Sequence, residues 1–398
     1  MKVDILGTAR KAAEIAGNLR VDLYSDTNSK PTPGMRQAIA DAVCGNEQAL
    51  EDPTTNALQE RVAELLGKEA SVFLPSGSMC NEIAYRIWAR QGDSVVMDKT
   101  GHANTSETGG PAALSGLMIH PIHGKNGIFT GDDVRKAAAT NNRHAPRPKI
   151  VNVENTANAG GGVIWPLAAI EDVASAAHES DMVAHMDGAR LLNAVVESGI
   201  PATEFTRHMD SVWLDFSKGL GCPIGAVLAG SNDFIDEAFR VKQQFGGALR
   251  QSGIVTSACL YALDHHVDRL RDDHENARRL HAGLGQMPGV TLQNEACETN
   301  LVFFDVSGTG KDARDVAAQL IERGVRIGAS SAVRMRAVTH LDVDAAGIDF
   351  AFPNKKSATS RNRKAVSGIF ELRHLFPRSR ISPAAIPGSR RFLCGIFI

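Results

Sequence analysis

The chain has 398 residues, of which 43% are hydrophobic and 22% are charged, and its formal net charge is −2. This length suits one large domain with a smaller one, and the charge balance gives no sign of a nucleic-acid or membrane partner. No apolar run is long enough to cross a bilayer, the N-terminus lacks the apolar core of a signal peptide, and six scattered cysteines lack metal-site spacing. We therefore expect reduced thiols in a cytoplasmic protein.

Residues 8–20 are predicted to form an amphipathic helix capped by Thr8, within an N-terminal arm over residues 1–25. Residues 26–257 then alternate helix-like and strand-like patterns, which indicates a large domain with a mainly parallel sheet covered by helices. Its helices are expected at residues 56–66, 76–88 and 167–178. Its strands are expected at residues 70–74, 94–97, 149–153, 181–185, 211–215 and 225–229, and the last strand is open to an antiparallel direction.

The pattern changes after Ser257. A long charged helix is expected over residues 258–284, followed by a strand, a helix and two short strands, at residues 300–305, 312–323, 325–327 and 333–337. These elements predict a second, smaller α/β domain over residues 258–352.

Residues 353–398 form a basic tail, with ten lysines and arginines against the single acid Glu371. Prolines and serines are frequent in the tail and apolar periodicity is weak. This composition is typical of a poorly ordered extension, and a nucleic-acid-binding tail is the alternative.

Two predicted strands that follow each other in the chain carry the most informative pattern, because each ends in polar and small residues. The first ends at Asp187-Gly188, and the second is followed by Ser217-Lys218-Gly219. Pyridoxal phosphate chemistry needs an amine that forms a Schiff base and a carboxylate that keeps the pyridine nitrogen protonated. Lys218 and Asp187 are candidates for these roles, although each alone is also typical of a turn or a solvated loop.

Other positions suit the remaining parts of such a site. Gly77 and Ser78 open a helix after a strand, where backbone N–H groups and the helix dipole favour a phosphate. His102 follows a strand end, where an imidazole can stack on a flat ring and move protons. Arg250 lies among glycines that permit close approach to a ligand, and Arg336 is a charge in an apolar strand, suited to a substrate carboxylate. Each also has an ordinary interpretation as a helix cap, a surface residue or a salt-bridge partner.

Together and in this order, the motifs resemble the low-specificity L-threonine aldolases, in the aspartate aminotransferase-like group of pyridoxal phosphate enzymes. The resemblance runs from Val21 to Asp344. It rests on residues 22–27, 51–56, 73–79, 154–156, 185–190, 217–221, 249–253 and 336–343. It implies a fold-type I α/β architecture, with a large mainly parallel sheet domain and a smaller C-terminal α/β domain.

The resemblance also implies roles around pyridoxal 5'-phosphate. Lys218 would hold the cofactor as a Schiff base, Asp187 would pair with the pyridine nitrogen, and Arg190 would lie near the ring's phenolic oxygen. Gly77 and Ser78 would hold the cofactor phosphate, and Arg250 would reach the same phosphate from a neighbouring subunit. His102 would stack on the face of the ring.

For the substrate, the resemblance implies that Ser25 and Arg336 hold the carboxylate. His144 falls where the family has a second active-site histidine, and in that role it would lie beside the substrate hydroxyl. The resemblance also implies a homo-oligomer, either a dimer or a tetramer, with active sites shared between subunits. The substrate it implies is a small β-hydroxy amino acid.

The chain departs from the family at a few positions near the expected pocket. Ala49 and Leu50 stand where the family has tyrosine and glycine, and Ala157 stands where it often has histidine. These departures leave aldehyde preference and stereochemical tolerance open, while the cofactor set is intact.

The function expected from the resemblance is cleavage of L-threonine, L-allo-threonine or related β-hydroxy-α-amino acids to glycine and an aldehyde. A β-eliminating lyase acting on a cysteine or serine derivative would use the same cofactor residues and remains the alternative. A transaminase is a further alternative that fits less well, because the resemblance is specific to the aldolase group. A non-catalytic protein whose basic tail binds nucleic acid is another, and Lys218 and Asp187 argue against it.

Overall fold

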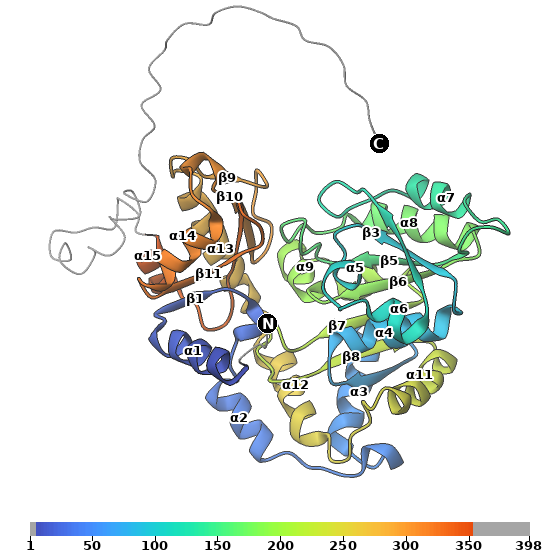
Figure 1. The fold of residues 1–398 in the computed structure, drawn as a ribbon. Helices are drawn as coiled ribbons and strands as arrows, with labels where there is room; N and C mark the ends of the chain where they lie inside the picture. Colours follow the sequence, from blue (N-terminus) through green and yellow to red (C-terminus); the bar gives the residue numbers. More distant parts are fainter. Residues whose placement is uncertain (1–4, 353–398) are drawn as a thin grey trace, which may run out of the picture.

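The computed structural model describes residues 5–352, and Figure 1 shows two groups of elements, each built on its own sheet. The basic tail over residues 353–398 lies outside the described residues. The larger sheet has seven strands in the order β2-β8-β7-β6-β5-β3-β4. In that order they are Ala70–Leu74, Ala226–Gly230, Ser211–Asp215, Val183–Gly188, Pro148–Glu154, Ser94–Asp98 and Met118–Ile122.

The direction of the strands confirms the mainly parallel sheet predicted from the sequence. β4, β3, β5, β6 and β7 run parallel to their neighbours in this order, whereas β8 runs antiparallel to both β7 and β2. The antiparallel direction left open for residues 225–229 is thus the one observed. Because the parallel strands share one direction, their carboxyl ends lie along one edge of the sheet.

Helices cover both faces of this sheet (Figure 1). From Pro33 to His265 the helices are α2 (Pro33–Ala40), α3 (Pro53–Leu65), α4 (Gly77–Trp88), α5 (His102–Thr105), α6 (Gly110–Ser115), α7 (Gly131–Ala138), α8 (Leu167–Glu179), α9 (Leu191–Ser198), α10 (Ala202–Thr206), α11 (Asn232–Gln244) and α12 (Gly253–His265).

Alternate residues of a strand point to opposite faces of the sheet, and β2 shows which helices cover each face. Phe73 packs into the core with α3, α8 and α12, whereas Val72 and Leu74 pack against α4 and α11.

Short polar residues fix where the main helices begin. Asp52 accepts a hydrogen bond from the Thr55 backbone N–H at the start of α3, and Ser76 accepts one from Met79 at the start of α4. Short 3₁₀ turns complete the loops, at η1 (Asp26–Asn28), η2 (Glu47–Ala49) and η3 (Ser307–Thr309).

The smaller sheet has five strands in the order β1-β11-β12-β10-β9, with β1 parallel to β11 and the other pairs antiparallel. In that order they are Val21–Leu23, Val325–Ala329, Arg334–Val338, Leu301–Asp305 and Thr291–Leu292. One face packs against α13, α15 and α14, which are Leu270–Leu284, Ala345–Ala351 and Ala313–Ile321. The other face carries Phe303, which pairs in register with Arg336. Arg336 therefore lies on the face of the smaller sheet that its helices leave uncovered.

Two expectations about helices are wrong. The charged helix expected over residues 258–284 is two helices, α12 and α13, with a break at residues 266–269. α12 already begins at Gly253, so the expected domain boundary at residue 257 falls inside a helix. Thr8 does not cap the first helix, because α1 spans Ile5–Asn18 and Thr8 lies within it. The expected N-terminal arm also contributes β1 to the smaller sheet.

Candidate active site

Lys218 lies just beyond the carboxyl end of β7, in a turn held by the last residue of that strand. The Asp215 carboxylate accepts hydrogen bonds from the backbone N–H and the hydroxyl of Ser217, and its second oxygen lies 2.8 Å from Lys218 Nζ. Gly221 closes the turn at φ +76°, in the left-handed region that glycine adopts without strain. The Lys218 side chain is 16% exposed, so its amine is held at the sheet edge and is not a freely moving surface group.

Asp187 lies at the carboxyl end of β6, the strand next to β7. Its carboxylate is buried and accepts hydrogen bonds from Asn81 Nδ2 at 3.1 Å and from the Ala189 backbone N–H at 3.1 Å. Burial, with the nearby Glu154 carboxylate, raises the pKa of Asp187 to about 7, although Lys218 and His102 act in the opposite direction. A buried carboxylate of this kind is suited to a cationic N–H partner.

Arg190 follows β6 and forms a buried, two-pronged ion pair with Asp26. Arg190 Nε and Nη2 each lie 2.7 Å from an Asp26 carboxylate oxygen, and Asn300 Nδ2 donates a further hydrogen bond at 3.0 Å. Burial alone would raise the pKa of Asp26, but the Arg190 guanidinium holds it well below its ordinary value. Because Asp26 follows β1 and Asn300 precedes β10, this cluster ties the smaller sheet to the edge of the larger one.

His102 opens α5, after β3, and is held by two acids. Its backbone N–H donates to Glu154 at 2.7 Å, and its ring Nδ1 lies 2.7 Å from Glu107 Oε1. The hydrogen bond with Glu107 raises the pKa of His102, burial opposes that shift, and Asp187 adds to it. The imidazole is 37% exposed, so it remains open to a ligand.

Gly77 and Ser78 form the first turn of α4, where backbone N–H groups lack partners within the helix. A Cβ added to Gly77 would collide with the Trp213 indole, so only glycine lets the start of α4 approach β7 this closely. Lys218 Nζ lies 5.5 Å from the same indole ring. The turn thus reaches the same edge of the sheet as Lys218.

Arg336 approaches this edge from the smaller sheet. Arg336 donates hydrogen bonds to Asn158 Oδ1 and to the Tyr24 carbonyl, both at 3.3 Å. Ser25 is the next residue after Tyr24, and its buried hydroxyl accepts a hydrogen bond from Thr27 Oγ1 at 2.8 Å. Ser25 and Arg336 therefore lie in neighbouring segments, next to the Asp26–Arg190 pair.

Two predicted site residues lie apart from this group within the subunit. His144 is exposed, in the loop before β5, and Arg147 of the same loop binds Asp93 at the amino end of β3. His144 is thus at the opposite edge of the sheet from Lys218. Arg250 is exposed in the loop between α11 and α12, where its carbonyl accepts a hydrogen bond from the Glu47 backbone N–H.

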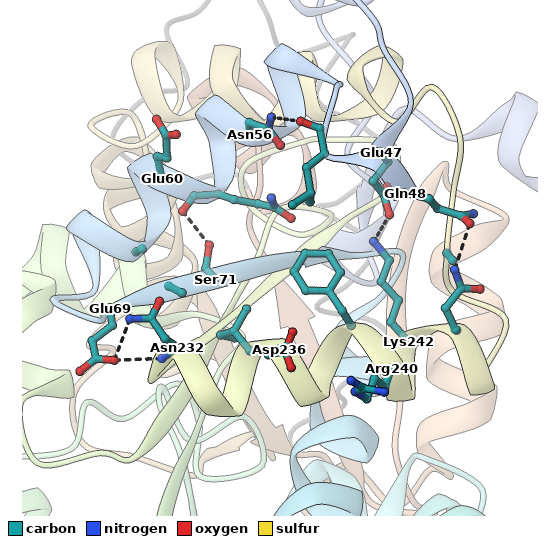
Figure 2. Close-up of a pocket in the computed structure, with 18 residues that line it drawn as sticks. Glu47, Gln48, Asn56, Glu60, Glu69, Ser71, Asn232, Asp236, Arg240 and Lys242 are labelled. Carbon is teal, nitrogen blue, oxygen red and sulfur yellow. Dashed lines mark hydrogen bonds and ion pairs between the residues drawn. The ribbon is translucent and has the colours of Figure 1, made fainter.

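A cavity of about 700 Å³ lies near the Arg250 loop, between α3, α11 and the first residues of β2. Figure 2 shows Lys242 and Glu47 paired at one end of this cavity and Glu69 bound to Asn232 at the other. None of the predicted site residues lines it. The chemistry at Lys218 therefore belongs elsewhere, at the sheet edge.

Four side chains that shape the site are not among the predicted site residues, namely Asp26, Asn81, Glu107 and Asp215. Asp215 stands three residues before Lys218, and Asp26 lies within one of the motifs quoted above, so both had a local signal. Asn81 and Glu107 had none, because they reach the site through contacts between distant segments.

The residues at this edge fit pyridoxal phosphate. Asp187 is a buried carboxylate suited to a protonated ring nitrogen, Lys218 supplies a primary amine, and Gly77 opens a helix N-terminus beside them. Within residues 5–352, no cluster of His, Cys, Asp and Glu side chains is arranged to hold a metal ion. The same described range contains no helix long and apolar enough to cross a membrane.

Comparisons with known proteins agree with this assignment. The Beta-eliminating lyase family model matches residues 22–307. The low specificity L-threonine aldolase of Escherichia coli (strain K12) is 36% identical over 324 residues, which cover 81% of this chain and 94% of that protein. Low-specificity L-threonine aldolase 1 of Arabidopsis thaliana is 33% identical over 337 residues, covering 83% of this chain and 94% of that protein.

Solved structures share the fold. A putative L-allo-threonine aldolase from Listeria monocytogenes superposes with a TM-score of 0.72 at 22% identity, covering 91% of this chain and 98% of that chain. The threonine aldolase of Leishmania major gives a TM-score of 0.71 at 20% identity, covering 82% and 96%. The fold is thus the fold-type I α/β architecture that the resemblance implied, and the chain belongs to the beta-eliminating lyase family, among the low-specificity L-threonine aldolases.

Proposed function

We propose that this protein is a pyridoxal phosphate-dependent aldolase that cleaves L-threonine, L-allo-threonine or related β-hydroxy-α-amino acids to glycine and an aldehyde. The observation that carries the proposal is the placement of Asp187 and Lys218 at the carboxyl ends of adjacent parallel strands. The named relatives support it, because the identity extends over most of both chains.

When bound, pyridoxal phosphate supplies an electron sink for the electrons of the broken Cα–Cβ bond. Lys218 holds the cofactor through its amine, and Asp187 holds a proton on the ring nitrogen. Gly77 and Ser78 bind the phosphate through the start of α4, where the helix dipole favours an anion. Arg190 lies near the phenolic oxygen of the ring.

Arg336 and Ser25 bind the substrate carboxylate in this proposal and so orient the bond to be broken. The β-hydroxyl loses its proton to a base, the Cα–Cβ bond breaks to release the aldehyde, and Cα takes up a proton to give glycine. His102 or His144, directly or through a water, is the base. Because His144 lies at the opposite edge of its own sheet, that role would fall to the partner subunit's His144.

We also propose a homo-oligomer in which two subunits complete each site. The support is a surface that one subunit leaves open: Arg250 is exposed, and the apolar side chains Val43, Leu50 and Ile254 are 67%, 59% and 48% exposed beside it. A second copy on this surface would bury those side chains and bring Arg250 of the partner subunit to the cofactor phosphate. A reducing, cytoplasmic compartment is also proposed, and the five cysteines of the described residues are free thiols.

The test is a product assay on the purified full chain with pyridoxal phosphate and L-threonine. Equal amounts of glycine and acetaldehyde are expected. β-Elimination is the alternative function, since the matching family model carries that name. Pyruvate and ammonia from a cysteine or serine derivative, with no glycine from threonine, would replace the aldolase proposal with that function.

A further inference from the structure

A connected polar network lies under the candidate active site and is centred on Asn81 of α4. Asn81 is fully buried and contacts acids from two different segments. Its Nδ2 lies 3.1 Å from Asp187 Oδ2 and 3.0 Å from Glu107 Oε1. One amide group therefore bridges the acid expected at the ring nitrogen and the acid that holds His102.

The orientation of this amide is fixed by its neighbours. Trp213 Nε1, which can only donate, lies 2.7 Å from Asn81 Oδ1, and His185 Nε2 lies 3.2 Å from the same oxygen. The oxygen is thus an acceptor, and Nδ2 must point its two N–H groups at Asp187 and Glu107. Reversing the amide would set its oxygen against two carboxylates and its N–H groups against the indole N–H.

Glu107 in turn fixes the protonation site on the His102 ring. The Glu107 side chain is 2% exposed, and the carboxylate oxygen that receives the Asn81 N–H also lies 2.7 Å from His102 Nδ1. An ionised carboxylate only accepts hydrogen bonds, so Nδ1 must carry a hydrogen. Nε2 is left as the ring nitrogen that exchanges a proton with a ligand.

We propose that Glu107 and Asn81 are positioning residues: Glu107 holds His102 with Nδ1 protonated, so that Nε2 does the proton transfer, and Asn81 ties this pair to Asp187. The consequence for the reaction rests on the proposed aldolase function. The protonation state of the His102 ring does not rest on that function, because it follows from the protein's own contacts.

The charges facing His102 decide the direction of the expected titration. Glu107 and Asp187 are acids near the ring, Glu154 accepts a hydrogen bond from the His102 backbone N–H, and Lys218 is the opposing cation as long as its amine does not hold the cofactor. Glu107 contributes most, and its hydrogen bond raises the pKa of His102. A group with a raised pKa keeps its proton to higher pH, so removing the Glu107 charge should lower the pH at which His102 titrates.

Glu82 offers a matched control in the same region. It is buried beside Glu107, and no hydrogen-bond partner is present for either of its carboxyl oxygens among the described residues. Burial, with the charge of Glu107, raises the pKa of Glu82 to about 8, so Glu82 is neutral at lower pH. Glu82→Gln replaces one neutral group by another there and should leave His102 unchanged.

The experiment measures deuterium exchange at the imidazole C2 position against pH, by mass spectrometry of the His102 peptide, in the full chain with cofactor. In the wild type, the His102 midpoint should lie above the ordinary value for a histidine side chain, because the Glu107 hydrogen bond raises the pKa of His102. Glu107→Gln should lower the His102 midpoint by about one pH unit or more. Glu107→Asp, which keeps the carboxylate, should leave the midpoint close to its wild-type value. Glu82→Gln should not move the midpoint.

An unchanged midpoint in Glu107→Gln, or an equal fall in Glu82→Gln, would overturn the proposal. If Glu107→Gln does not fold, the wild-type measurement decides, and a His102 midpoint at or below the ordinary value for a histidine side chain overturns the proposal. The readout needs no turnover. A protein that shows the shift without cleaving threonine would refute the proposed function and leave the positioning role standing.

Discussion

The two halves of the proposed site differ in how they are built. At the sheet edge, Asp187, Lys218 and His102 are held by strand ends, short hydrogen bonds and burial within one subunit. Arg250 and His144 lie in exposed loops away from that edge. The first half is placed by the fold of a single chain, whereas the second half would depend on contacts between the subunits of the proposed oligomer.

The largest effect is expected at the sheet edge. Lys218→Ala removes the amine proposed to hold the cofactor, and threonine cleavage should fall by roughly a thousand-fold or more, equivalent to about 4 kcal/mol of transition-state stabilisation. Lys136→Ala is the control, because Lys136 is 78% exposed on α7. Glycine formation from threonine is the measurement, and substantial activity in Lys218→Ala would show that another amine does this work.

Asp187→Asn should have a smaller effect on the same half. The neutral amide keeps the shape of the side chain but no longer favours a protonated ring nitrogen. We expect cofactor binding to persist while turnover falls by roughly a hundred-fold, about 2.7 kcal/mol. Turnover is compared with the absorbance of bound cofactor, and near-normal turnover at full occupancy would remove Asp187 from its assigned role.

The shared-site proposal is tested by mixing two inactive variants. Arg250→Ala and Lys218→Ala chains, unfolded and refolded together, should regain part of the wild-type activity, because one site of a mixed dimer would contain both intact residues. Each variant refolded alone is the control. Failure to regain activity in oligomers shown to be mixed would place Arg250 in its own subunit's site, or outside the site altogether.

The smallest effect is expected beside the Arg250 loop, at Leu50. Leu50 has φ +58°, a left-handed conformation that costs a non-glycine residue roughly 1–2 kcal/mol. The side chain is 59% exposed, so Leu50→Gly loses little burial and should change the free energy of unfolding by at most about 1 kcal/mol, toward greater stability. Ala49→Gly, one residue earlier in a 3₁₀ turn, should instead destabilise, and urea unfolding of both variants is the check. A destabilised Leu50→Gly would mean that the side chain makes contacts in the oligomer that outweigh the strain.

The sequence predicts the sheet edge well because the relevant signals are local. A buried strand followed by Asp187-Gly188, and another followed by Ser217-Lys218, place both side chains at carboxyl ends once the sheet is parallel. The break after α12 was missed, because residues 258–284 keep helical apolar spacing across it and no glycine or proline stands at residues 266–269 to mark it.

Contacts between distant segments were beyond the sequence patterns. Asp26 pairs with Arg190 and Asn81 bridges Asp187 and Glu107, and each pair is far apart along the chain. Nothing in the spacing of these residues marks them as partners, because the contacts arise only when α4, β6 and the smaller sheet pack together. The exposed positions of Arg250 and His144 likewise follow from packing.

Lys218 as the point of cofactor attachment is the central claim, and chemical trapping tests it most directly. The purified protein with pyridoxal phosphate is reduced with borohydride, digested, and the peptides are mapped by mass spectrometry. The cofactor should be found on Lys218, with the exposed Lys136 unlabelled. Cofactor on a different lysine, or no labelled peptide from a protein that cleaves threonine, would contradict the account.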